Sequence, residues 1–334
     1  MQNLKRTLYT SGLLLVLMVS GSWGFLAHRT INQLAVYELP KDLCSFYYDN
    51  LDYLVRNAPR PDVRRNTDST EANKHFIDLE FYGDSAAWKM PMNWDDAVRT
   101  YSKDSLLKYG YLPYLIMRVK DSLTDAFRNR NSERILFYTA DLGHYIGDAH
   151  VPLHTSINYD GQLTNQKGLH SLWESMIPEL ELNNYDLSSR HKAKYLRDPQ
   201  TALWGAIRNS FSLLNDVFSQ EIAATSGFTD STKFRIQNRR GRDVKSFTTD
   251  FAKAYSAKLG NSINKQLTSS ADMLADFIYT SWVDAGKPDV KHLIRSSFKT
   301  EKKQQLKKER KAFKHNELIR DSMLLARKLN FNAE

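Results

Sequence analysis

The sequence predicts an all-α protein, a compact multi-helix domain that carries a basic helical tail at its C-terminus. Apolar residues recur at the 3.6-residue spacing of an amphipathic helix through most of the 334 residues. Convincing segments of alternating apolar and polar residues joined by hairpin turns, which would indicate strands, are absent. With 41% apolar side chains, a chain of this length can bury one large core or two modest ones.

The individual helices follow from the apolar positions, taken in chain order. The first comes after His28, where apolar residues form one stripe: Ile31, Leu34, Ala35 and Leu39. Further periodic segments predict helices over 41–56, 94–108, 111–129, 132–149, 169–180, 200–224 and 247–284.

Two loops interrupt this helical pattern. The first opens at Pro59 and runs to about residue 73, because residues before a proline are pushed out of the helical conformation. The second is the polar stretch from Gly161 to Gly168. We expect this second loop to lie at the mouth of the functional site.

The N-terminal segment reads as a secretory signal peptide over residues 1–22. Lys5 and Arg6 form a charged start, Leu13 to Val19 an apolar run too short to span a bilayer, and the small residues 20–22 a cleavage site. The mature protein is therefore expected to begin at Trp23, with its main domain over 23–290. Its predicted location is periplasmic or extracellular.

The net charge of +9 is confined to the tail over residues 291–334. The tail holds 13 of the 47 Lys and Arg residues and 5 of the 38 Asp and Glu residues, whereas residues 23–290 hold 32 basic and 33 acidic residues. The global charge thus says nothing about the site. We expect the tail to be a solvated helix or extension, or alternatively to attach to an anionic surface of lipid headgroups or nucleic acid.

The most informative part of the chain lies between His144 and Glu174. It contains two histidine–carboxylate pairs four residues apart, His144 with Asp148 and His170 with Glu174, and a further histidine, His154. Residues four apart share one face of a helix, so each pair can direct two ligands toward one point. A single such pair is usually a surface hydrogen bond. Two pairs and a third histidine in apolar surroundings predict a multinuclear zinc site, because nitrogen and oxygen donors together suit zinc.

Three further segments extend this pattern toward the N-terminus. They read Trp23-Gly-Phe-Leu-Ala-His28, Pro61-Asp62-Val63-Arg64-Arg65 and His75-Phe76-Ile77-Asp78. With these segments in place, the chain resembles the superfamily shared by zinc-dependent phospholipases C and single-strand-specific zinc nucleases. The resemblance runs in order from Trp23 to about Glu174, extends over the helical domain to about residue 290, and leaves out the tail.

The resemblance implies a cluster of three zinc ions. The first would be held by four side chains, Asp62, His75, His144 and Asp148, and the second by His154, His170 and Glu174. The third would bind the α-amino nitrogen and carbonyl oxygen of Trp23 and the side chain of His28, with Asp148 bridging it to the first. Because only a free amine offers a lone pair, removal of the signal peptide would complete the third site.

The same resemblance implies a phosphodiesterase in which a zinc-activated hydroxide attacks phosphorus near neutral pH. Asp62 would orient or deprotonate this nucleophile besides binding metal. Arg65, three residues further on, would neutralise the charge that develops on the phosphoryl group.

The substrate stays open between nucleic acid and phospholipid. In the nuclease branch, an aromatic residue stacks on a nucleobase and a following acid binds the base edge, roles that would fall to Phe76 and Asp78. Glu174 and the short loop before His170 resemble the phospholipase branch instead. The single cysteine, Cys44, excludes the disulfides that are common among the nucleases.

A non-catalytic protein is the alternative from a different class. It would be an exported zinc-binding module whose basic tail binds an anionic surface. No obligate protein partner is evident from the sequence. Hydrolysis of a generic phosphodiester that a chelator abolishes would separate the enzyme from this module.

Overall fold

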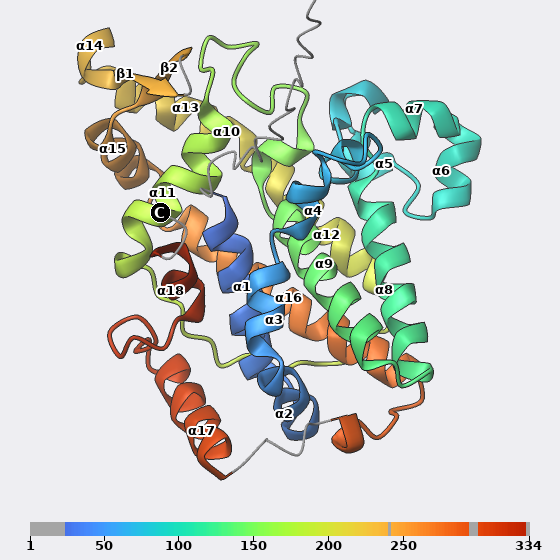
Figure 1. Cartoon of the computed structure of the whole chain (residues 1–334). Helices are drawn as coiled ribbons and strands as arrows, with labels where there is room; N and C mark the ends of the chain where they lie inside the picture. The colour runs from blue at the N-terminus through green and yellow to red at the C-terminus, as the bar shows by residue number, and fades with distance from the viewer. Residues whose placement is uncertain (1–23, 240–241, 294–299, 332–334) are drawn as a thin grey trace, which may run out of the picture.

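Helices make up nearly all of the regular structure in the computed structural model of the chain, in which residues 24–239, 242–293 and 300–331 are described (Figure 1). Within these residues, strands occur only in one two-stranded sheet. The predicted all-α fold class is therefore confirmed. None of the described helices combines the length and the apolar character needed to cross a membrane.

The N-terminal part of the fold is a series of short and medium helices. They are α1 (Phe25–Glu38), α2 (Lys41–Asp49), α3 (Leu51–Asn57), α4 (Arg60–Arg64) and the 3-10 turns η1 (Ala72–Lys74) and η2 (Leu79–Tyr82). The helix predicted over 41–56 breaks at Asn50, whose side chain caps the Phe46 carbonyl. The loop predicted from Pro59 contains α4, because Pro61 sits in the first turn of that helix, where no N–H is needed.

The middle of the chain contains the helices that carry most of the site. They are α5 (Ala86–Lys89), α6 (Trp94–Tyr101), α7 (Lys103–Lys108), α8 (Leu112–Arg128), α9 (Ser132–Ala149), η3 (Pro152–Thr155), α10 (Leu169–Ser171), the π-helical turn η4 (Leu172–Met176), α11 (Ile177–Glu181) and η5 (Leu182–Asn184). The helix predicted over 94–108 is interrupted at Ser102, which has a φ of 68°. The loop predicted over Gly161–Gly168 is confirmed as a series of turns.

The C-terminal part begins with two helices and ends with the tail. It contains α12 (Pro199–Ser212), α13 (Leu214–Thr225), α14 (Asp230–Lys233), β1 (Phe234–Arg239), β2 (Arg242–Phe247), α15 (Thr249–Leu259), α16 (Ser262–Asp284), η6 (Lys291–Leu293), α17 (Thr300–Lys314) and α18 (Leu325–Phe331). The helix predicted over 247–284 is in fact two, separated at Gly260, which has a φ of 59°.

The hairpin of β1 and β2 contradicts the expectation that strands are absent. The strands are antiparallel, and Phe234 pairs with Phe247. The Phe247 ring stacks on that of Phe251 in α15 with 5.1 Å between centroids, whereas Ile236 is 65% exposed. The hairpin is held by a few aromatic contacts at one end and has no continuous apolar face. Its strands therefore lack the regular alternation by which a strand is predicted from a sequence.

Helices α1, α8, α9 and α16 pack against one another in the centre of the fold (Figure 1). Helix α1 is buried on nearly all sides, including its polar residues Thr30, Asn32 and Gln33. Helix α9 is buried over its last three turns, from Thr139 to Ala149. These two helices carry three of the predicted ligands, so the core of the protein holds the site in place.

The tail contradicts the expectation of a solvated helix. Helices α17 and α18 pack against α1, α2 and α3, and Leu306, Phe313 and Leu324 are buried in the same apolar core as the main domain (Figure 1). The buried Gln33 side chain of α1 accepts hydrogen bonds from the backbone N–H groups of Leu325 and Ala326. The few apolar residues of the tail are thus used for packing, and only its outer face is basic.

Candidate metal centre

Helix α9 supplies two of the predicted ligands from one buried face. The Nδ1 of His144 donates a hydrogen bond to the Ala58 carbonyl over 3.0 Å, which leaves a lone pair on Nε2. That Nε2 atom lies 3.4 Å from Oδ2 of Asp148, one helical turn further on. The i,i+4 spacing read from the sequence therefore brings both donors to one point, and Ala58 sets the tautomer.

The first donor group joins Asp62, His75 and His144. The His144 Nε2 atom lies 3.1 Å from Nδ1 of His75 and 3.8 Å from Oδ1 of Asp62. The Nδ1 atom of His75 lies 2.9 Å from Oδ2 of Asp148, so Asp148 also borders this group. Tetrahedral zinc with bonds of 2.0–2.1 Å separates its ligand atoms by about 3.3 Å, which falls within the range of these distances.

The second donor group consists of His154, His170 and Glu174. The Nδ1 of His154 donates to the His75 carbonyl over 2.5 Å, so its Nε2 faces the group with a free lone pair. The Nε2 of His170 lies 2.9 Å from that atom and 2.7 Å from Oε2 of Glu174. Glu174 lies in the π-helical turn η4, a distortion that often marks functional sites in helices.

A third group forms around His28 of α1. Its Nε2 lies 3.5 Å from Oδ1 of Asp148 and 3.2 Å from Oε1 of Glu174, and its ring stacks on that of His144 with 3.9 Å between centroids. Trp23, the predicted terminal ligand, lies outside the described residues. The next residue, Gly24, places the chain beside this group, since a Cβ built there would be 3.9 Å from the Glu174 carboxylate.

Charge is unevenly distributed among these side chains. Burial lowers the pKa of His75, but the hydrogen bond to Asp148, the neighbouring Glu71 carboxylate and the charges of Asp148 and Asp62 outweigh burial and raise that pKa to about 9. Burial lowers the pKa of His144 to about 3, and the neighbouring His28 adds to this effect. In the metal-free site, His75 therefore holds a proton that a metal ion would have to displace.

The donor set fits zinc. In two histidine pairs, ring nitrogens face one another: His154 with His170 at 2.9 Å and His75 with His144 at 3.1 Å. Two such lone pairs repel each other unless a proton or a cation lies between them. Carboxylate oxygens border each pair, and nitrogen and oxygen donors in this number are typical of zinc sites. The assignment of the individual ligands to three ions stays a prediction.

Arg65 lies at the solvent edge of the first donor group. Its Nη1 is 3.5 Å from Oδ1 of Asp62, and its side chain is 47% exposed. The guanidinium can therefore reach a phosphate that approaches the donor group without losing a buried partner.

Phe76 and Asp78 lie on the segment that follows His75, and both are half-buried. The Phe76 ring rests on Gly110, which has a φ of +86° and whose missing Cβ would lie 2.6 Å from Phe76 Cδ2. Burial raises the pKa of Asp78 to about 7, and the charge of Glu80 adds to the rise. An aromatic ring and a carboxyl group that can donate or accept a hydrogen bond thus lie two positions apart, on the segment that follows the donor His75.

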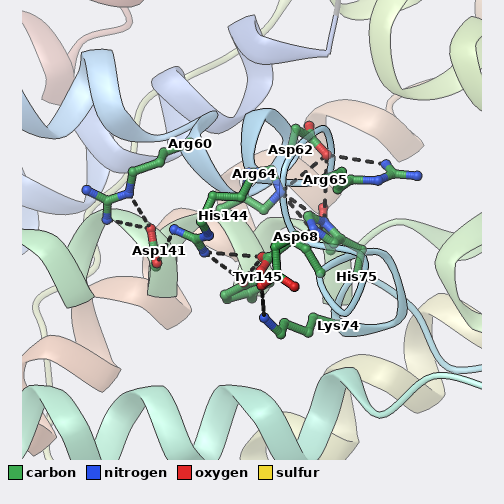
Figure 2. A network of polar contacts seen from close by, with 12 residues as sticks. Arg60, Asp62, Arg64, Arg65, Asp68, Lys74, His75, Asp141, His144 and Tyr145 are labelled. Atoms are coloured by element: carbon green, nitrogen blue, oxygen red, sulfur yellow. Dashed lines mark hydrogen bonds and ion pairs between the residues drawn. The ribbon is translucent and has the colours of Figure 1, made fainter. Parts of the chain in front are cut away.

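A network of buried charges was missed by the sequence reasoning. Arg60 and Arg64 converge on Asp141 of α9, at 2.6 and 2.9 Å, and Tyr145 lies beside Arg64 (Figure 2). Asp141 lies three residues before His144, on the face of α9 that meets α4. In the sequence, an aspartate within an otherwise apolar helix face needs a cationic partner, and the arginines at 60 and 64 could have been proposed as that partner. The network holds α4, which carries Asp62, against α9.

Comparison with known proteins gives the family. The model of the S1/P1 nuclease family matches residues 23–282. The chain belongs to the S1/P1 nuclease family. A search of curated proteins gives no match to the chain. Membership confirms the zinc-dependent nuclease and phospholipase superfamily indicated by the sequence and makes the protein a zinc-dependent hydrolase of the nuclease type.

Proposed function

We propose that the protein is an exported phosphodiesterase that cleaves single-stranded nucleic acid at a centre of three zinc ions. The convergence of the three donor groups on Asp148 and Glu174 carries the proposal, and the family match supports it. Bound zinc would supply a nucleophile from water at neutral pH and stabilise charge on the phosphate.

The protein's own residues perform the other tasks. Asp62 borders the first donor group and is 28% exposed, so it can both bind metal and orient an incoming water. Arg65 beside it places a positive charge next to an entering phosphate. Phe76 and Asp78 would hold an unpaired nucleobase by stacking and by a hydrogen bond to its edge. A paired base has its edge occupied, which favours single strands.

Phospholipid remains the competing substrate, because Glu174 and the short loop before His170 resemble the phospholipase branch. The test uses mature protein that begins at Trp23, loaded with zinc and offered single-stranded DNA, RNA and phosphatidylcholine vesicles in parallel. We expect cleavage of nucleic acid only, and loss of cleavage in excess chelator. Diacylglycerol release without nucleic-acid cleavage would replace the proposal with a phospholipase C. Full zinc loading without any turnover would favour the non-catalytic protein.

The proposal also includes activation by export. If the Trp23 amine is a ligand, one additional residue before Trp23 converts that amine to an amide, which has no lone pair to donate. We expect such a protein to bind one zinc fewer and to lose activity. Unchanged metal content and activity would contradict the role of Trp23 and leave the substrate proposal standing.

We further propose that the outer face of α17 contacts an anionic membrane surface. Its lysines are exposed and have no ion-pair partner among the described residues: Lys307, Lys308, Lys311 and Lys314. Each lysine near an anionic bilayer contributes about 1 kcal/mol. We expect Lys307→Glu with Lys311→Glu to reduce sedimentation with phosphatidylglycerol vesicles roughly tenfold or more. Lys253→Glu with Lys258→Glu on α15 is the charge-matched control, and an equal loss there would contradict a specific face.

A further inference from the structure

Glu71 lies behind His75, on the side of the ring that faces away from the other metal donors. The Nδ1 of His75 faces Asp148 and His144, at 2.9 and 3.1 Å. Its Nε2 lies 3.7 Å from Oε1 of Glu71, which precedes it by four residues. Glu71 is fully buried, so its carboxylate has no access to solvent.

The surroundings of Glu71 keep this buried carboxylate charged and fixed. Lys74 contacts Oε2 at 2.6 Å, and Arg64 contacts Oε1 at 3.2 Å. The Tyr145 hydroxyl donates to the same Oε1. Burial without partners would cost a carboxylate several kcal/mol, and these three donors from α4, η1 and α9 offset that cost. The charge is thus retained on a side chain that is 0% exposed.

In zinc sites, a ligating histidine commonly donates its second ring N–H to a carboxylate. Such a carboxylate fixes the ring orientation and raises the basicity of the ligating nitrogen. Glu71 is placed on the corresponding side of His75, but at 3.7 Å from Nε2, which is an ion-pair distance and longer than a hydrogen bond. His144 and His154 instead have their Nδ1 atoms on backbone carbonyls, so His75 alone among these three ligands depends on a side chain.

We propose that Glu71 is a positioning residue for the metal centre: its buried charge lies 3.7 Å from Nε2 of His75, favours the tautomer with the proton on Nε2, and so holds Nδ1 toward Asp62 and His144. The inference rests on the proposed zinc centre but not on the choice of substrate. Arg64, Lys74 and Tyr145 in turn hold Glu71. Arg64 links this unit to Asp141 and Arg60, so the whole network has a role in orienting a ligand (Figure 2).

The test separates orientation of His75 from simple anchoring of the segment. Glu71→Gln removes the charge but keeps the shape. Asp141→Asn is the matched control, because it weakens the same network through Arg64 without touching His75. Zinc affinity is measured by competition with a chromophoric chelator, and the stability of the metal-free proteins by urea unfolding.

We expect Glu71→Gln to weaken one of the zinc equivalents by about 10- to 100-fold, the effect typical of such outer carboxylates. Asp141→Asn should destabilise the metal-free protein but leave zinc affinity within about threefold. Wild-type zinc affinity in Glu71→Gln, or equal weakening in the two variants, would overturn the proposal.

Glu71→Asp is the second variant for the zinc-affinity measurement, and it replaces Glu71→Gln if that protein does not fold. It keeps the charge that Arg64 and Lys74 neutralise but withdraws it from His75 by one methylene. The same weakening of one zinc equivalent is expected, and wild-type affinity in this variant would overturn the proposal. Because the readout is metal binding, failure of nucleic-acid cleavage would not be mistaken for failure of this inference.

Discussion

Gly147 of helix α9 lies directly against the His28 ring, and replacement of this glycine by alanine tests how tightly the third donor group is held. A Cβ at Gly147 would lie 2.8 Å from Nδ1 of His28 and 3.1 Å from Cδ1 of Ile31. Both neighbours are buried, at 2% and 3% exposure, so neither can move into solvent. Gly205 in α12 is the matched control, because it lies inside a helix with nothing within 4 Å of its missing Cβ.

Two effects of known size oppose each other at Gly147. Alanine in place of glycine stabilises a helix interior by about 1 kcal/mol. Overpacking a well-filled core destabilises by about 1–3 kcal/mol. The free energy of unfolding should therefore rise by about 1 kcal/mol in Gly205→Ala. In Gly147→Ala it should be about 1–3 kcal/mol lower than in that control. Displacement of the His28 ring should also move Nε2 away from Asp148 and Glu174.

The assay is urea unfolding of the two metal-free variants, followed by zinc analysis of the reloaded proteins. Gly147→Ala should lose affinity at one zinc equivalent, and Gly205→Ala should retain all of them. Equal stabilisation of both variants would refute the close packing of α9 on His28. Full zinc affinity in Gly147→Ala would refute the role of His28 as a ligand.

Three further predictions follow from the same structure. Glu38 is buried, and burial with the charges of Asp272 and Asp276 raises its pKa to about 11. Its folded-state pKa lies above the unfolded value, so stability is lost as pH rises from about 4.5 toward 11. Measured by urea unfolding, the stability of Glu38→Gln relative to wild type should therefore increase by up to about 1 kcal/mol per pH unit between pH 5 and 8. Parallel pH profiles of the two proteins would contradict a raised pKa for Glu38. Phe313→Ala should cost about 3–5 kcal/mol in urea unfolding, because Phe313 is 3% exposed in the core; a change below 1 kcal/mol would mean that the tail does not pack. Asp148→Asn should lower the zinc content of the purified protein below two equivalents, since Asp148 contacts His75 and His144 of the first donor group and His28 of the third; retention of three would remove Asp148 from the ligand set.

The helices and two of the candidate ligand pairs were predictable from the sequence for the same reason. Both depend on residues close together in the chain, where helical spacing converts directly into geometry. The candidate ligands His28, Asp62 and His75 came from the family resemblance instead. The His144–Asp148 and His170–Glu174 pairs needed nothing beyond the i,i+4 rule. The helix over 132–149 was predicted with its observed bounds because a regular apolar stripe runs through it.

The remaining features depend on contacts between distant segments, which a single sequence does not display. The breaks at Ser102 and Gly260 are residues of positive φ inside apolar patterns that continue on both sides, so the patterns alone do not mark them. The role of Glu71 depends on donors from α4 and α9. The burial of the tail depends on Gln33, which lies 292 residues before its partner Leu325. The charges of the tail were read correctly, but the few apolar residues between them decide where it lies.

The most direct test of the account is a zinc titration of metal-free protein that begins at Trp23, with cleavage of single-stranded DNA followed at each addition. A centre of three zinc ions should give no cleavage in the absence of zinc and a rise in cleavage that is complete only at three equivalents per chain. Full activity at one equivalent, or cleavage that persists in excess chelator, would contradict a centre in which the three donor groups act together.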